Sequence, residues 1–219
     1  MLSTLMCSAF FMKNSKRIGL YVILDKQYIA DCKDLARYAV KKNIRYIQYR
    51  DKNSSNDEFI NNVKKIVNIT KGTKSNFIIN DRVNIAKEIN ADGIHIGQED
   101  TNYEYTRDVV SDKIIGISTH NLQQAINAEK IGADYIGIGP IFKTSSKRKP
   151  DPVIGLEGLK KISAKISIPK VAIGGINRSN VRSVMNTGVD GCAIISSILN
   201  SDDPKNEIDK ILEILNEKI

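Results

Sequence analysis

The stretch Ile44-Arg45-Tyr46-Ile47-Gln48-Tyr49-Arg50-Asp51-Lys52, residues 44–52, begins as a mostly apolar run of strand length and ends in three charged residues. A segment with helical spacing follows it, in which Phe59, Val63 and Ile66 recur on one face. Strand, polar loop and helix in this order make one βα unit, and the rest of the chain repeats that order.

Eight apolar, β-branched runs recur along the 219 residues, with helical periodicity between them. Strands that are apolar on both faces and joined by helices indicate a parallel sheet. Eight such units favour an α/β fold closed into a (β/α)8 or TIM barrel, as a single domain over residues 18–219. An open doubly wound sheet has the same local signals and is the alternative. The expected strands are 19–24, 44–49, 76–79, 92–96, 113–117, 133–137, 169–173 and 190–195.

The two ends of the chain lie outside this repeat. Residues 204–218 carry Ile208, Ile211 and Leu215 at helical spacing, so we expect a last helix that completes the outer ring. Residues 1–17 are interpreted as an N-terminal extension, either loose or the result of a start assigned too far upstream. Their positive charges follow the apolar run, whereas a secretory signal has them before it.

Composition restricts the partners of the chain. A net charge of +8 suggests nucleic acid, but the lysines are scattered, with few aromatic residues between them to stack on bases. The three cysteines share no metal or disulfide spacing, which favours a reducing cytoplasm. We therefore expect a cytoplasmic protein that binds small phosphorylated molecules and neither nucleic acid nor membrane. The sequence leaves open whether it forms a homo-oligomer.

Side chains capable of chemistry gather where the expected strands end. Parallel barrel strands all end at one rim, and barrel active sites are built there, so these residues are expected to surround a single mouth. They are Gln48, Arg50 and Lys52; Asn80 and Asp81; His95 to Asp100; Ser118, Thr119 and His120; the loop from Gly139 to Lys147; Gly174 and Gly175; and Ser196 and Ser197.

Two of these groups suit phosphate. Gly174-Gly175 and Ser196-Ser197 follow the seventh and eighth strands, where barrels commonly bind phosphate through backbone N–H groups. A tight turn and two helix caps are the plainer interpretation of each group alone. Their joint occurrence favours a phosphate site.

A metal ion and a diphosphate also fit this rim. Asp81 and Asp100 offer carboxylate oxygens, and Mg²⁺ commonly takes one or two such ligands together with phosphate oxygens. Arg50, Lys52 and Lys147 add three positive charges. Unpaired phosphate charges away from water are costly, so this amount of counter-charge suits a diphosphate better than a single phosphate.

The two histidines have less specific surroundings. His95 lies within an apolar strand, where a packed and hydrogen-bonded histidine is more common than a catalytic one. His120 follows Ser118-Thr119 and either bonds a heterocycle or caps the next helix. The spacing suggests no Ser-His-Asp set and no cysteine paired with a base.

On these residues the chain resembles the thiamine-phosphate synthase family. The resemblance extends over about residues 18 to 204. It rests on Gln48-Tyr49-Arg50-Asp51-Lys52, Ile79-Asn80-Asp81-Arg82, Gly93 to Asp100, Gly116-Ile117-Ser118-Thr119-His120, Gly137-Ile138-Gly139-Pro140-Ile141-Phe142 and Ala172-Ile173-Gly174-Gly175-Ile176.

The resemblance implies a transferase that joins 4-amino-2-methyl-5-(diphosphooxymethyl)pyrimidine to 4-methyl-5-(2-phosphooxyethyl)thiazole, giving thiamine phosphate and diphosphate with Mg²⁺. Ser118 and Lys147 would be catalytic, and Asp81 and Asp100 would hold the metal. The implied pyrimidine diphosphate contacts are Gln48, Tyr49, Arg50, Asp51, Lys52, Asn80, Ser118 and Lys147; those to the thiazole phosphate are Thr144, Ser145, Ser146, Gly174, Gly175, Ile195 and Ser196.

The chain departs from the family pattern in two places. Lys143-Thr144-Ser145-Ser146-Lys147 stands where the family commonly has Pro-Thr-x-Thr-Lys, so the hydroxyl and the charge are kept and the proline is lost. Tyr49 stands where leucine is common, and strand alternation predicts that it points away from the site. Two alternatives remain: a thiazole tautomerase with His120 as the proton-handling residue, and a barrel that binds these phosphates without turnover.

Overall fold

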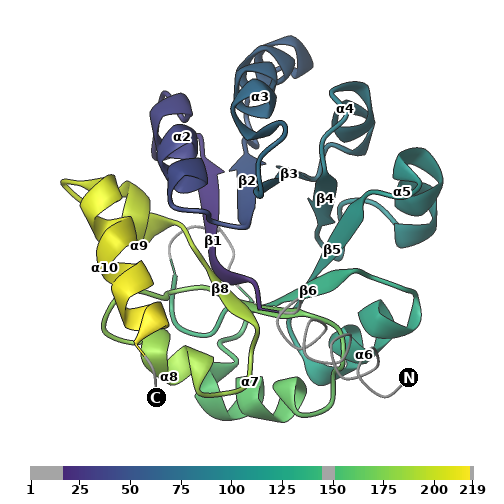
Figure 1. Cartoon of the computed structure of the whole chain (residues 1–219). Helices are drawn as coiled ribbons and strands as arrows, with labels where there is room; N and C mark the ends of the chain where they lie inside the picture. The colour runs from purple at the N-terminus through teal and green to yellow at the C-terminus, as the bar shows by residue number, and fades with distance from the viewer. Residues whose placement is uncertain (1–16, 145–150, 218–219) are drawn as a thin grey trace, which may run out of the picture.

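Eight parallel strands form a closed barrel in the computed structural model, which describes residues 17–144 and 151–217. Each strand pairs with the next, and the first pairs with the eighth, so the open doubly wound sheet is excluded and the predicted (β/α)8 barrel is confirmed (Figure 1). The strands are β1 (Gly19–Asp25), β2 (Tyr46–Arg50), β3 (Asn76–Asn80), β4 (Gly93–Ile96), β5 (Ile114–Thr119), β6 (Tyr135–Ile138), β7 (Lys170–Ile173) and β8 (Gly191–Ile194).

The helices lie outside the ring of strands (Figure 1). Four of the nine described helices begin after a residue whose side chain accepts a backbone N–H of the first turn, namely Ser55, Asn102, Asn121 and Asp203. The helices are α2 (Lys33–Lys41), α3 (Asn56–Thr70), α4 (Val83–Glu88), α5 (Tyr103–Val110), α6 (Leu122–Lys130), α7 (Gly155–Ser163), α8 (Val181–Met185), α9 (Ser196–Leu199) and α10 (Pro204–Asn216).

The core consists of two layers of side chains. Between strands and helices lies a large aliphatic layer that includes Ile47, Phe59 and Ile211. Inside the barrel a smaller cluster gathers around Tyr21 and Tyr135. The predicted last helix is confirmed: α10 packs Ile208, Ile211 and Leu215 against α8, α9 and β1 and so fills the last gap in the outer ring.

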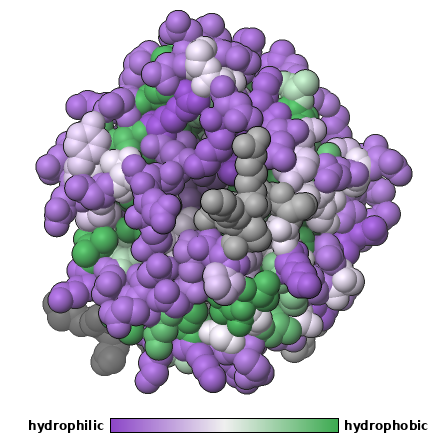
Figure 2. All heavy atoms as spheres, turned by 180° about the vertical axis from the view of Figure 1, so that it is seen from behind, coloured by the Kyte–Doolittle hydropathy of each residue, from purple (hydrophilic) through white to green (hydrophobic). Residues whose placement is uncertain are grey.

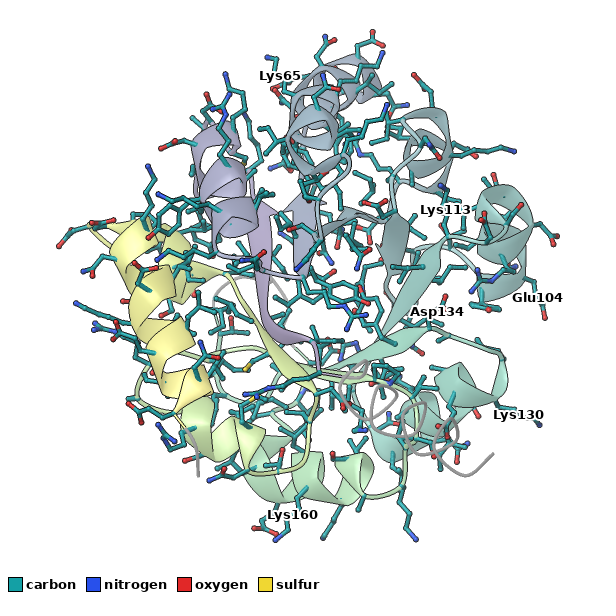
Figure 3. All side chains as sticks on the ribbon, viewed as in Figure 1. Lys65, Glu104, Lys113, Lys130, Asp134 and Lys160 are labelled. Atoms are coloured by element: carbon teal, nitrogen blue, oxygen red, sulfur yellow. The ribbon has the colours of Figure 1, made fainter. Side chains whose placement is uncertain are left out.

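An aspartate before each of β4, β6 and β8 ties that strand to its predecessor. Asp92, Asp134 and Asp190 each donate their backbone N–H to a residue of the preceding strand and accept that residue's N–H on the side-chain carboxylate, at 2.8 Å in all three cases. Asp134 lies at the outer edge of the sheet between β5 and β6 (Figure 3). These residues stabilise the rim formed by the N-terminal ends of the strands, opposite the rim where the strands end. Recurring features at the N-terminal rim of a barrel are expected to serve stability.

The face of the molecule shown in Figure 2 is mainly hydrophilic. Lys65, Lys113, Lys130 and Lys160 lie apart from one another around the outer ring, so they form no single basic stripe (Figure 3). Over residues 17–144 and 151–217, every helix falls short of the length and apolar character needed to cross a bilayer. The expectation for residues 1–16 lies outside the described part of the chain.

Candidate active site

Gln48, Arg50 and Lys52 extend from β2 toward the barrel mouth, but each has a different surrounding. Gln48 is buried inside the barrel, where its Nε2 donates to the hydroxyl of Tyr21 at 2.9 Å. Arg50 is partly buried at the rim. The Lys52 side chain lies just beyond the strand and is about half exposed. The wall predicted from strand alternation therefore runs from the barrel interior out to solvent.

Arg50 is oriented by a residue that sequence reasoning did not single out. Asp25 ends β1 directly beside Arg50 in the parallel register, and its carboxylate accepts a short hydrogen bond from the guanidinium. The Asp25 side chain is 2% exposed, so this ion pair has little competition from water. A guanidinium has five N–H donors in a fixed plane, so the pair holds that plane and leaves donors for an anion.

Lys52 contacts the two predicted metal ligands at once. Its Nζ forms a close ion pair with Asp81 and lies 3.6 Å from Asp100. The two carboxyl groups come from neighbouring strand ends, because Asp81 follows β3 and Asp100 belongs to the loop after β4. Asp81 adopts a left-handed backbone conformation (φ 62°), and its N–H donates to the carbonyl of His95. The turn therefore brings this carboxylate toward the β4 loop.

Burial and the closeness of the two carboxyl groups shift the pKa of each. Partial burial raises the pKa of Asp81 to about 6, and a hydrogen bond with Asp100 adds to the rise while Lys52 opposes it. The pKa of Asp100 is lowered: burial works against ionisation there, but the hydrogen bond from Asp81, the charge of Lys52 and the Gly97 N–H outweigh it. Asp100 therefore ionises before Asp81, and both carboxyl groups share the ammonium group of Lys52.

These two carboxylates could hold a divalent cation. Their oxygen atoms suit Mg²⁺, which would neutralise the negative charge that Lys52 balances only in part. The part of the chain that the structure describes contains no group of three or more His, Cys, Asp or Glu side chains placed to hold a metal. Only a site completed by substrate oxygens and water is consistent with this arrangement.

Asn80 and Ser118 lie at the same mouth. Asn80 ends β3 and is paired in register with His95 of β4. The Ser118 hydroxyl of β5 is 2.9 Å from Nε2 of His95, and its backbone carbonyl accepts from Gln98 at 2.6 Å. His95 is therefore a hydrogen-bonded residue of the barrel interior, and loss of hydration lowers its pKa to about 4.

The side chains of Tyr49 and Asp51 serve the fold. Tyr49 packs its ring edge-on against Phe59 in the layer between strands and helices, so it points away from the mouth as alternation predicts. Asp51 accepts hydrogen bonds from the N–H groups of Asn53 and Ser54 and closes the loop after β2. Any contact from these two positions to a ligand would come from the backbone.

The two groups of residues predicted to bind phosphate follow neighbouring strands, since Ile173 of β7 pairs with Ala193 of β8. Gly174 and Gly175 both have positive φ and pack against the loop after β6. A Cβ on Gly175 would lie 2.6 Å from the carbonyl oxygen of Lys143, closer than side chains tolerate. Across from this turn, Ile195 precedes α9 and Ser196 is its first residue.

A family model described as thiamine monophosphate synthase matches residues 20–198. The chain belongs to the thiamine monophosphate synthase family. The resemblance carried by the motifs is thereby confirmed. Thiamine-phosphate synthase of Clostridium botulinum (strain Loch Maree / Type A3) is 43% identical over 89% of this chain and 96% of its own length. The thiamine-phosphate synthase of Clostridium novyi (strain NT) is 46% identical over 84% of this chain and 92% of its own length.

A solved structure extends the similarity to three dimensions. Thiamine phosphate pyrophosphorylase from Pyrococcus furiosus superimposes with a TM-score of 0.83 at 37% sequence identity, covering 91% of this chain and 96% of that one. The family assignment covers the whole described rim, from Asp25 to Ser196.

The loop after β6 is only partly described for this member of the family. Thr144 is half-buried at the last described position before the gap. Ser145, Ser146 and Lys147, which carry predicted roles, lie outside the described residues. His120, the residue a tautomerase would need, lies with Nδ1 2.6 Å from the Gly139 carbonyl and Nε2 3.5 Å from Asp151.

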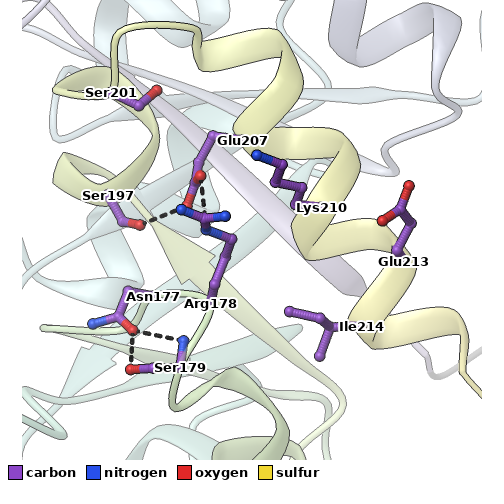
Figure 4. Close-up of a pocket in the computed structure, with 9 residues that line it drawn as sticks. All are labelled: Asn177, Arg178, Ser179, Ser197, Ser201, Glu207, Lys210, Glu213 and Ile214. Carbon is purple, nitrogen blue, oxygen red and sulfur yellow. Dashed lines mark hydrogen bonds and ion pairs between the residues drawn. The ribbon is translucent and has the colours of Figure 1, made fainter.

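A surface hollow behind the phosphate turn involves a residue that the sequence did not single out. Glu207 of α10 is buried, accepts a hydrogen bond from Ser197 of α9 and pairs with Arg178 of the loop after β7 (Figure 4). Asn177 and Ser179 hydrogen-bond to each other beside them. In this family member α10 therefore ties together the two loops that were predicted to bind phosphate.

Proposed function

We propose that this chain is a thiamine-phosphate synthase, a transferase that couples 4-amino-2-methyl-5-(diphosphooxymethyl)pyrimidine with 4-methyl-5-(2-phosphooxyethyl)thiazole. The observation that carries the proposal is the meeting of Arg50, Lys52, Asp81 and Asp100, from three strands or the loops after them, at one mouth. The names of its relatives support the same activity. A tautomerase or a simple binding barrel has no need of this charge arrangement.

The reaction breaks one C–O bond and forms one C–N bond. The diphosphate leaves with the bonding electron pair, the electron-rich aminopyrimidine stabilises the cation that remains, and the thiazole nitrogen supplies the new pair. No proton transfer is required, so the reaction needs no general base. The protein has to orient two rings and stabilise a departing anion.

Each rim residue then has a defined task. Arg50, Lys52 and Asn80 bind the diphosphate, joined by Lys147, and Ser118 donates a hydrogen bond to it as charge develops. Gln48 binds the pyrimidine. The turn at Gly174-Gly175, with Ile195 and Ser196, holds the thiazole phosphate together with Thr144, Ser145 and Ser146. Asp81 and Asp100 would hold Mg²⁺, which when bound would neutralise charge on the leaving diphosphate.

We further propose that the enzyme works in the cytoplasm on these small molecules. Cys32 and Cys192 are free and buried, which suits a reducing compartment.

The direct test incubates the purified protein with both substrates and Mg²⁺ and detects thiamine phosphate by mass spectrometry. Product is expected only when both substrates are present, and a chelator should abolish it until the ion is added back. Binding of both substrates without product would favour the non-catalytic barrel. Turnover that is unchanged by chelation would remove the metal role of Asp81 and Asp100.

A further inference from the structure

A chain of four hydrogen bonds crosses the barrel interior. It runs from Gln48 to Tyr21, on to Tyr135, then to His95 and finally to Ser118, and every donor–acceptor distance is 2.9 Å. The five side chains come from five strands, β2, β1, β6, β4 and β5. Under the proposed function the first and last members bind the substrates, and the side chains of the three between them connect those two.

The strands make room for this chain with two glycines. Gly116 of β5 is paired in register with both His95 of β4 and Tyr135 of β6, so those two side chains meet across a position that has none. A Cβ on Gly116 would lie 2.1 Å from the Tyr135 ring. Gly137, paired with Ser118, lies under the imidazole of His95, and a Cβ there would be 3.2 Å from the ring. The absence of a side chain at Gly116 and Gly137 therefore allows His95 to contact Tyr135 and Ser118.

The direction of the chain follows from its Gln48 end. An amide nitrogen only donates, so the Tyr21 oxygen accepts there and its one hydrogen goes to Tyr135. Tyr135 in turn donates its own hydrogen to Nδ1 of His95, which leaves the ring hydrogen on Nε2 for Ser118. Burial raises the pKa of both tyrosines and lowers that of His95 to about 4, so each member keeps a single hydrogen for the chain near neutral pH.

The Ser118 end requires the same direction. Under the proposed function, on which this step rests, Ser118 faces a diphosphate, whose oxygens accept hydrogen bonds. A serine hydroxyl has one hydrogen, so it can donate to the diphosphate only if it accepts from His95. The reverse direction would present an oxygen lone pair to the departing anion and repel it.

We propose that Tyr21, Tyr135 and His95 are positioning residues that impose one hydrogen-bond direction on both ends of the chain, leaving a donor at Ser118 and an acceptor at the Gln48 carbonyl oxygen. The donor stabilises the leaving diphosphate. The acceptor selects a pyrimidine with an exocyclic amino group, and it strengthens electron donation from that group into the ring as the cation forms. One buried chain thus assists both halves of the bond-breaking step.

The tautomer of His95 tests the inference without any turnover. The chain has only two histidines, so ¹⁵N-histidine labelling and long-range ¹H–¹⁵N correlation spectra give two ring systems, which a His120→Gln variant assigns. At pH 7.5 we expect His95 to carry its hydrogen on Nε2. A hydrogen on Nδ1 would overturn the proposal. Because this readout needs no product, it separates failure of the hydrogen-bond chain from failure of the proposed reaction.

Variants test the functional consequence. Tyr135→Phe removes the central link, and we expect kcat to fall by about tenfold to a hundredfold. This is less than the roughly hundredfold to thousandfold loss when a donor to a developing anion is removed outright, because Ser118 itself remains. The His95 spectrum should shift to mixed tautomers. Tyr46→Phe is the matched control, because its ring packs against Tyr21 and Tyr135 inside the barrel and its hydroxyl is not a member of the chain. Equal kcat in the two variants, or an unchanged His95 tautomer in Tyr135→Phe, would overturn the proposal; should Tyr135→Phe not fold, the wild-type spectrum decides.

Discussion

Asp81 and Asp100 both pair with the ammonium group of Lys52 at the barrel mouth, although they come from loops after different strands. Burial and the neighbouring Asp100 raise the pKa of Asp81, and the Lys52 ammonium group offsets part of that rise. The structure thus concentrates negative charge at one point of an otherwise basic rim. That concentration is expected to make cation binding depend on pH.

We predict that metal affinity falls as the pH drops below about 6. The raised pKa of Asp81 means that protons compete with a cation from about pH 6 downward. With Mn²⁺ as the probe, titration calorimetry should show weaker binding at pH 5 than at pH 7.5, by about tenfold for each unit below the pKa. Equal affinity at the two pH values would contradict the assignment of Asp81 as a ligand.

Asp81→Asn should separate stability from activity. The folded-state pKa of Asp81 lies above its unfolded value, so its contribution to stability is full below about pH 3.8 and is lost as the pH rises through about 6. At pH 8 the ionised side chain therefore destabilises the metal-free fold, and the substitution should raise the free energy of unfolding by about 1 to 3 kcal/mol. Asparagine also tolerates the positive φ at this position.

Urea unfolding of both proteins without metal measures this effect. The gain should shrink toward pH 4, where the aspartate is protonated, while synthase activity of the variant should be reduced at every pH. A variant that is less stable than the parent at pH 8 would show that the carboxylate is needed for the fold.

Asp25→Asn should weaken binding of the pyrimidine diphosphate. Asp25 holds the guanidinium plane of Arg50, and the asparagine keeps the size of the side chain without its charge. Loss of one charge-assisted hydrogen bond predicts a rise in KM of about tenfold. Asp31→Asn is the matched control, because Asp31 pairs with Lys33 on the exposed surface. Steady-state kinetics would contradict the role if both variants behaved alike.

The fold was largely predictable because its signal repeats. Each strand is an apolar run bounded by polar residues, and the predicted strand ends lie within two residues of the observed ones. The helical periodicity is weak in two of the observed helices. α7 contains Gly155 and Gly158, which weaken helical periodicity, and α5 buries Thr106 in place of an aliphatic residue.

The site was predictable only where residues themselves carry the chemistry. Arg50, Lys52, Asp81 and Asp100 were recognised from charge at strand ends, and the structure brings them together. Asp25 was missed because its role depends on the register of β1 with β2, which places it beside Arg50. The hydroxyls of the interior tyrosines were missed for a related reason: an apolar strand pattern shows that a tyrosine is buried and gives no sign of which polar groups it meets.

Asp134→Ala should lower stability and leave catalysis unchanged. Its carboxylate accepts from the N–H of Ile115 and pairs with Arg107, at the barrel end away from the mouth. Losing these interactions predicts a decrease of about 1 to 3 kcal/mol in the free energy of unfolding. Asp108→Ala, on an exposed position of α5, should have little effect. If kcat per folded molecule also fell in Asp134→Ala, the aspartates before β4, β6 and β8 would have a role beyond the scaffold.

Gly175→Ala should impair thiazole phosphate binding through the loop after β6. Gly175 (φ 66°) and Gly72 (φ 73°) have nearly the same left-handed backbone, so an alanine at either position carries similar strain, about 1 kcal/mol. They differ in space: a Cβ on Gly72 meets nothing within 4 Å, whereas on Gly175 it would press on Lys143 and Phe142. Gly72→Ala therefore controls for backbone strain, and the excess effect at Gly175 measures displacement of the loop. We expect KM for the thiazole phosphate to rise in Gly175→Ala alone, with KM for the pyrimidine diphosphate less affected. Equal rises for both substrates would mean that the turn supports the whole mouth and is not specific to one phosphate.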